Sequence, residues 1–221
     1  RFDIKQENIA KAGIWIAKKR YAQWIINVEG HTVSKLDVKG LDVVRSSFPP
    51  AFRKFMAEVL EDILNDIDKV ELDDKILKFK DHIKSLDLID VMFPIGVKNV
   101  KKYTKKGDDP FTPRMKGTPV HVKAALNYND MLRHHKIRTI RGMINGEKIK
   151  WTYLKANPMS LDTMALKGYE DPDVLRKFVE SYIDYNKVFK SAFANKLNDF
   201  YAALGWGQIP ENNNLGKFFS F

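Results

Sequence analysis

The spacing of hydrophobic positions changes along the chain. Between residues 13 and 44, β-branched and aromatic residues predominate, and Glu29-Gly30 and Lys39-Gly40 are dipeptides typical of turns. This part predicts strands in an antiparallel arrangement. Further along, several long stretches have apolar residues at intervals of three and four, as on one face of a helix. We therefore expect an α+β fold that is mainly helical and carries small antiparallel β-elements.

The first helix is predicted to begin at Pro49-Pro50, because proline suits the first turn of a helix, and its apolar pattern continues to Ile67. Ser46 and Ser47 are candidate N-caps for it. A second helix is predicted over residues 73–85. The short apolar run at residues 88–93 suits a strand.

Prolines and glycines in residues 109–119 predict a loop that leads into a helix over residues 120–134. Residues 138–154 predict a hairpin, since Asn145-Gly146 lies between two β-type runs.

The longest helical pattern begins at Asp171-Pro172 and is stopped by Gly205-Trp206-Gly207. Its aromatic residues recur at helical spacing. This spacing favours packing in the core over a platform on which bases would stack.

Composition narrows the class of partner. The chain has 221 residues, is 44% hydrophobic and has a formal net charge of +10, so it can bury a core and favours a polyanionic partner. Charge alone does not separate DNA, RNA and an anionic membrane. The chain has no cysteine, which excludes disulfides and cysteine-based zinc sites. No run of about 18 apolar residues occurs, and the polar start does not resemble a signal peptide, so we expect a soluble protein.

Two basic clusters are candidate phosphate-binding stretches. The first places three adjacent cations and an aromatic between two apolar runs. The second is rich in lysine and also contains a tyrosine that can stack or pack against a sugar. Solvated strand tips and exposed loops explain such clusters equally well on composition alone. The residues concerned are Lys18, Lys19, Arg20 and Tyr21 in the first cluster and Asn99, Lys101, Lys102 and Tyr103 in the second.

A third candidate is the loop at Lys116-Gly117, which opens the helix carrying His121 and Lys123. A glycine loop that feeds a helix N-terminus presents backbone N–H groups to an anion. A lone histidine near a helix start is more often a packed or capping group than a base contact. No metal-ligand set is predicted, because His134-His135 has no carboxylate at ligand spacing.

The end of the chain combines a polar linker, residues 208–214, with a short apolar segment. Large apolar side chains on a hydrophilic tail favour docking, either on this domain or in the pocket of a partner. The spacing favours the partner, because Leu215 and Phe218 share one side of a helical turn and Phe219 adds an anchor. The candidate docking residues are Leu215, Phe218, Phe219 and Phe221.

These stretches resemble family B DNA polymerases in the order in which that family has them. Gly13 to Ala22 contains a Lys-Lys-Arg-Tyr motif like the one where palm meets thumb, and Lys35 to Pro49 is similar to the pattern that leads into the thumb. Lys116 to Asn129 resembles the thumb motif of phage replicative polymerases. The sequence Asn212-x-x-Leu215-x-x-Phe218-Phe219 is similar to the peptide that binds a sliding clamp, although Asn212 stands where that peptide has glutamine.

The resemblance implies the C-terminal thumb part of a phage family B polymerase, as a fragment or as one half of a split enzyme. It implies a palm-edge β segment over residues 1–45, a thumb domain over 46–207 and a clamp-binding tail over 208–221. The implied partners are primer-template duplex DNA, a sliding clamp and the remaining palm and exonuclease half, with no membrane. The implied location is the cytoplasm of an infected bacterial host.

In that family the palm carries the metal-binding aspartates, in an Asp-x-x-Ser-Leu-Tyr motif and a Tyr-Gly-Asp-Thr-Asp motif, and neither occurs in this chain. We therefore expect no catalytic residue and no cofactor in this chain, with Mg²⁺ only in the missing palm, and no DNA synthesis by the chain alone. The alternative is a stand-alone DNA-binding accessory protein of phage replication. An RNA-binding module is disfavoured, because no ribonucleoprotein aromatic motif occurs.

Overall fold

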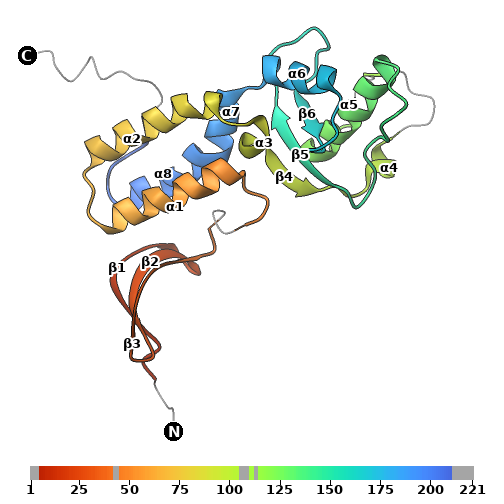
Figure 1. Cartoon of the computed structure of the whole chain (residues 1–221). Coiled ribbons are helices and arrows are strands. Elements are labelled where there is room, and N and C mark those ends of the chain that lie inside the picture. The colour runs from red at the N-terminus through yellow and green to blue at the C-terminus, as the bar shows by residue number, and fades with distance from the viewer. Residues whose placement is uncertain (1–4, 42–44, 105–109, 112–113, 211–221) are drawn as a thin grey trace, which may run out of the picture. The chain divides into compact units, whose positions relative to one another are not determined.

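The computed structural model describes residues 5–41, 45–104, 110–111 and 114–210. It divides into two compact units, of which unit 1 comprises residues 1–85 and 189–221, and unit 2 comprises residues 86–188. Each unit combines helices with one small antiparallel sheet (Figure 1). The predicted α+β fold is confirmed. The predicted functional division at residues 45/46 and 207/208 stays a prediction.

Unit 1 begins with a sheet of three sequential strands, β1 (Asn8–Ala17), β2 (Arg20–Val28) and β3 (His31–Lys39). Both pairs are antiparallel, as the sequence predicted. The Glu29-Gly30 turn joins β2 to β3, and both of its residues have positive φ, which glycine adopts without strain.

The helices of unit 1 pack around a core of aromatic side chains. They are α1 (Pro50–Leu64), α2 (Lys69–His82), the single turn η2 (Ile83–Ser85), the π-helical η3 (Lys190–Ala194) and α8 (Asn195–Ala203). Phe55 stacks on Phe79 with ring centroids 3.8 Å apart, and Phe193 lies against both. The hydroxyl of Tyr201 on α8 donates a hydrogen bond of 2.7 Å to Asp73 on α2, which ties the two chain segments of the unit together.

Two details of the helix starts in unit 1 differ from the sequence prediction. The N-cap of α1 is Pro49 and makes no side-chain hydrogen bond, so the predicted serine caps are wrong. The helix α2 begins at Lys69, earlier than predicted, because the Asp68 side chain accepts hydrogen bonds from the backbone N–H groups of Val70 and Glu71.

Unit 2 builds its sheet from β4 (Phe93–Gly96), β5 (Lys148–Tyr153) and β6 (Thr163–Leu166), in that order and antiparallel. The helix α5 (Val120–His134) packs against it, and the Asn127 side chain donates to the Thr163 carbonyl at 2.8 Å. The short helices α3 (Leu88–Val91) and α4 (Val100–Tyr103) flank β4 in the sequence. After β6 come α6 (Asp173–Tyr182) and α7 (Tyr185–Phe189). The helix predicted over residues 120–134 is confirmed.

Three predictions in unit 2 are wrong. Residues 88–91 form a helical turn, with only Phe93 from the predicted strand beginning β4. The predicted hairpin over 138–154 does not form, because β5 pairs with β4 and β6 and the Asn145 side chain accepts from the Val100 backbone N–H. The long helix is interrupted at Ile183, which adopts an extended conformation and forms a β-bridge with Leu154.

Within the part of the chain that the structure describes, no helix is long and apolar enough to cross a membrane.

Candidate nucleic-acid interface

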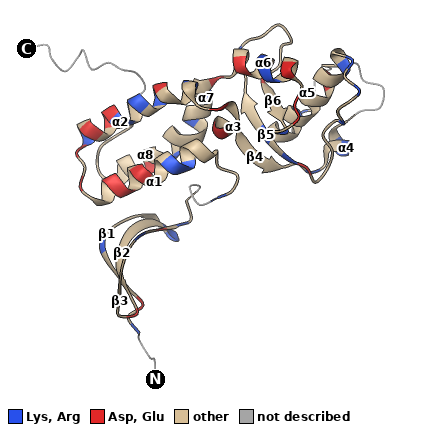
Figure 2. Cartoon of the chain, viewed as in Figure 1, with Lys and Arg blue, Asp and Glu red and all other residues tan. Residues whose placement is uncertain are grey.

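Lys18 and Lys19 form the two-residue turn between β1 and β2, which is closed by the pairing of Ala17 with Arg20. Both side chains are exposed, and Figure 2 shows the positive charge at this end of the hairpin. Lys19 has a φ of 62°, a conformation that is uncommon for residues other than glycine. The prediction that this motif lies on or beside a strand is confirmed.

The backbone of Gly40 fixes the position of this turn. Gly40 has a φ of +65°, and a Cβ added there would lie 2.1 Å from the Lys19 carbonyl oxygen. Only a residue without a side chain fits so close to the turn. Gly40 thus holds the lysine turn against the end of β3.

Arg20 is held by an acid from the other chain segment of unit 1. Its guanidinium forms an ion pair of 2.8 Å with Asp199 on α8, and both side chains are about two-fifths exposed. An ion pair this exposed contributes at most about 1 kcal/mol to stability. The contact orients Arg20 but leaves it able to exchange partners.

Aromatic side chains continue the surface beyond the turn. Tyr21 pairs in register with Trp15 on β1 and with Lys39 on β3, so these three side chains share one face of the sheet. Trp15 is 61% exposed and its indole lies over Gly13, where a Cβ would come within 2.4 Å of the ring. This face therefore combines flat apolar groups with a lysine.

The second basic cluster lies in unit 2 and is helical where the structure describes it. Asn99 has a left-handed backbone conformation and precedes α4, on which Lys101 and Lys102 are exposed. The Lys102 ammonium lies 5.5 Å from the centre of the Tyr103 ring. Cations on a half-buried aromatic suit contact with a sugar-phosphate backbone.

The third candidate, at the start of α5, is less uniform. Lys116 is exposed in the turn that contains Gly117, whose φ is +84°. Burial lowers the pKa of His121, so the imidazole favours its neutral form at neutral pH. Lys123 forms an ion pair of 2.6 Å with Asp162, an acid that sequence patterns did not connect with it.

A buried carboxylate supports the loop ahead of α5. Asp130 is 1% exposed, pairs with Arg114 and Arg133, and accepts a 2.8 Å hydrogen bond from the Phe111 backbone N–H. Asn129 binds the backbone of Met143 through both atoms of its amide, so the polar end of this helix serves the fold.

The predicted clamp-binding residues Leu215, Phe218, Phe219 and Phe221 lie outside the described residues. Among the described residues, no three His, Asp or Glu side chains come together as a metal site requires.

Sequence reasoning missed the acids that hold two of the predicted DNA contacts. Asp199 lies 179 residues from Arg20, and Asp162 lies 39 residues from Lys123. No local signal marks either pair, because each acid is a surface residue of an otherwise ordinary element.

Comparison with known proteins adds an independent line. Residues 1–109 match the family model of DNA polymerase family B. The chain is 27% identical over 201 residues to the DNA-directed DNA polymerase of Escherichia phage RB69, a match that covers 86% of this chain and 21% of that protein. It is 25% identical over 189 residues to the corresponding enzyme of Enterobacteria phage T4, covering 84% of this chain and 20% of that protein.

A shorter match, 33% identical over 84 residues, links the chain to the catalytic polypeptide of DNA polymerase alpha from Saccharomyces cerevisiae. This match covers 37% of this chain and 6% of the yeast protein. The chain spans about a fifth of the length of the phage relatives. The family resemblance predicted from the motifs is confirmed. The chain is a relative of the family B DNA polymerases of bacteriophages.

Proposed function

We propose that this chain is the thumb part of a phage family B DNA polymerase and that it holds primer-template duplex DNA. The observation that carries the proposal is the turn of Lys18 and Lys19, which projects two exposed cations and is locked by Gly40. Arg20 and Tyr21 extend this surface, and Lys101, Lys102, Tyr103 and Lys116 supply a second one in unit 2.

Contacts of this kind bind phosphate and sugar and carry little sequence information, as a replicative enzyme requires. Two of the proposed contacts, Arg20 and Lys123, must exchange an acidic partner for a phosphate when DNA binds. His121 is a packing or sugar-contacting residue in this proposal, since its neutral imidazole offers no charge to a phosphate.

Replacing Lys18 and Lys19 together with alanine is expected to weaken duplex binding about tenfold and to reduce the slope of log affinity against log salt by about 1.8. Each lysine that neutralises a phosphate releases about 0.9 of a counterion, so the slope counts the lost contacts. Fluorescence anisotropy with a primed duplex at several salt concentrations measures both quantities.

The matched control is Lys78→Ala with Lys84→Ala, which removes the same charge from exposed positions on or next to α2. An unchanged salt slope in the Lys18/Lys19 variant, or an equal effect in the control, contradicts the proposed interface.

Replacing Asp199 with asparagine is expected to tighten duplex binding about two- to fivefold, because Arg20 no longer has to give up an ion pair worth up to about 1 kcal/mol. Asp66→Asn is the control, since it removes an equal charge from an exposed position of the same unit. Weaker binding by the Asp199 variant would show that the carboxylate is needed to orient Arg20.

We assign no phosphoryl-transfer step to this chain. Two-metal chemistry needs paired carboxylates, and the described residues offer no cluster that fits Mg²⁺. We propose that the metal ions belong to a palm half that carries the two missing aspartate motifs, and that both halves act in the infected bacterial host. Recovery of primer extension when such a palm half is added tests this pairing. A failure to associate with it favours the stand-alone accessory protein.

The tail is proposed to bind a sliding clamp through its apolar residues. A synthetic peptide of residues 208–221 is expected to bind a phage clamp, and replacing both Phe218 and Phe219 with alanine is expected to weaken binding by at least about 100-fold, since two aromatic anchors are lost. Isothermal titration calorimetry measures the affinities. Replacing Asn213 and Asn214 with alanine is the control. Equal binding of the native and Phe218/Phe219 variant peptides would remove the clamp from the proposal.

A further inference from the structure

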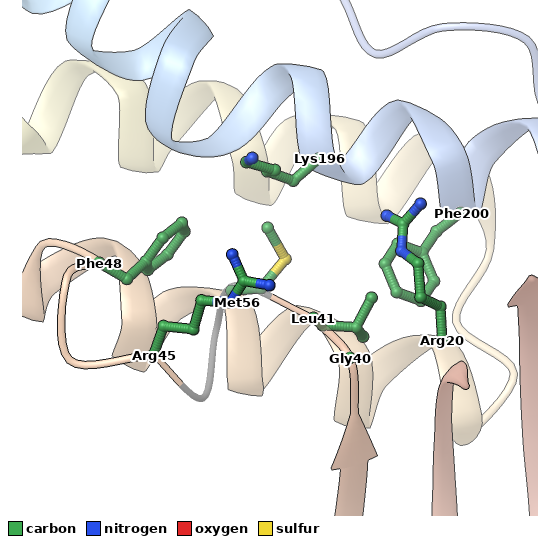
Figure 3. A pocket seen from close by; sticks show the side chains of 8 residues that line it. All are labelled: Arg20, Gly40, Leu41, Arg45, Phe48, Met56, Lys196 and Phe200. Carbon is green, nitrogen blue, oxygen red and sulfur yellow. The ribbon is translucent and has the colours of Figure 1, made fainter. Parts of the chain in front are cut away.

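Unit 1 contains a pocket of about 310 Å³ that the proposed grip on duplex DNA does not explain. It is lined by side chains from three parts of the unit, namely the start of β2, the segment between β3 and α1 with α1 itself, and α8 (Figure 3). The lining residues are Arg20, Gly40, Leu41, Arg45, Phe48, Met56, Lys196 and Phe200.

Three of the lining residues are cations. In Figure 3, Arg45 lies near Phe48 and Met56, Lys196 descends from α8, and Arg20 lies beside Phe200. They come from positions far apart in the sequence, so no solvated basic run accounts for their meeting. Asp199 pairs with Arg20, and the cations that line the pocket outnumber this carboxylate. The pocket therefore favours an anion.

The rest of the lining is apolar. Leu41, Phe48, Met56 and Phe200 are all buried, each less than 7% exposed. An inorganic anion surrounded by water would leave these surfaces without a partner. A pocket of about 310 Å³ has room for roughly ten waters at about 30 Å³ each, and it lies at the lower end of the roughly 300–1,000 Å³ range of small-molecule sites.

We propose that this pocket binds a nucleoside carrying a terminal phosphate. The phosphate meets Arg20, Arg45 and Lys196, and the sugar or base rests on the apolar lining. The ligand is either a free nucleoside monophosphate or the phosphorylated end of a strand, since both present the same group.

Charge and shape favour this group over its alternatives. A phosphomonoester carries a charge of about −1.5 to −2 near neutral pH, whereas an internal phosphodiester carries only one negative charge. It also has three terminal oxygens for three cations, whereas a carboxylate has two. A phosphate within a continuous duplex cannot fill the apolar part of the pocket, because its nucleoside is stacked and paired.

The test uses the intact chain and isothermal titration calorimetry with a series of probes. Thymidine 5′-monophosphate is expected to bind at least about tenfold more tightly than thymidine, inorganic phosphate or phenylacetate. In parallel, the methyl resonance of Met56 is expected to shift on addition of the monophosphate, because Met56 lines the pocket.

Variants place the site. Replacing Arg45 and Lys196 together with alanine is expected to weaken binding of the monophosphate at least about tenfold. Arg53→Ala with Lys54→Ala is the matched control, since it removes one arginine and one lysine from exposed positions of α1. Thermal unfolding verifies that each variant is folded. Lys196→Glu provides a second variant that reverses one charge and retains Arg45.

Competition identifies the source of the phosphate. Displacement by 5′-phosphorylated hexathymidylate, but not by the 5′-hydroxyl form, supports a strand end, and displacement by neither supports a free nucleotide. Equal affinity for inorganic phosphate, for phenylacetate or for the 5′-hydroxyl strand overturns the proposal, as does a Met56 resonance that does not move.

This result is separable from the proposed function. The Lys18/Lys19 variant is expected to lose duplex affinity while retaining binding of the monophosphate, because neither lysine lines the pocket. Loss of monophosphate binding in that variant alone would overturn the assignment to this pocket.

Discussion

Replacing Asp130 with alanine is expected to lower the free energy of unfolding of unit 2 by about 3–5 kcal/mol, because breaking a buried ion pair leaves the other charge without compensation. Asp130 is 1% exposed and the Arg114 side chain is 8% exposed, so water does not replace the lost carboxylate. The Phe111 backbone N–H also loses its acceptor. Native-state hydrogen exchange of the amides in α5 measures the effect within unit 2.

The control for this prediction is Asp162→Ala, in the same unit. Asp162 pairs with Lys123 at the surface and is 55% exposed, so its loss is expected to cost less than about 1 kcal/mol. Similar losses in the two variants would mean that Asp130 is not the support of the loop before α5.

Replacing Gly40 with alanine is expected to destabilise unit 1 by about 2–4 kcal/mol and to weaken duplex binding in the molecules that remain folded. The added Cβ meets the Lys19 carbonyl at 2.1 Å, and an L-residue at a φ of +65° is strained in addition. Chemical denaturation measures the stability, and anisotropy at low salt measures the binding.

Gly30→Ala separates the two causes. Gly30 has a φ of +88° in the same sheet, and a Cβ there meets nothing within 4 Å. It is expected to cost only the backbone strain, about 1 kcal/mol, with duplex binding unchanged. If the two alanine variants behaved alike, the close approach of Gly40 to the lysine turn would have no energetic weight.

Local patterns predicted the elements whose causes are local. The helix over residues 120–134 has a proline before it and an apolar face that α5 buries, and both signals lie within one stretch. The turn at Glu29-Gly30 follows from the freedom of glycine at positive φ. The lysine turn was predicted to lie at a strand junction because apolar runs flank it on both sides.

Tertiary contacts decided the remaining cases. Asn145-Gly146 is a good hairpin signal, yet the Asn145 side chain accepts from Val100, 45 residues away, and β5 takes β4 as its partner. Ile183 fits a continuous helix, but it forms a bridge with Leu154 instead. A distant segment supplied the competing hydrogen bonds in both places, and a pattern within one stretch does not contain that information.

The candidate site shows the same division. Sequence patterns selected the cations of the turn, but they did not show that Arg20 has Asp199 as a partner or that Arg45 and Lys196 line one pocket. These relations join chain segments that meet only in the folded unit 1.

The division of unit 1 between residues 1–85 and 189–221 also sets an order of events during protein synthesis. Phe200 and Tyr201, which are buried in that unit, leave the ribosome more than a hundred residues after β3. Unit 2 has all of its residues in one uninterrupted run, so a nascent chain can complete it while unit 1 still waits for its last helix.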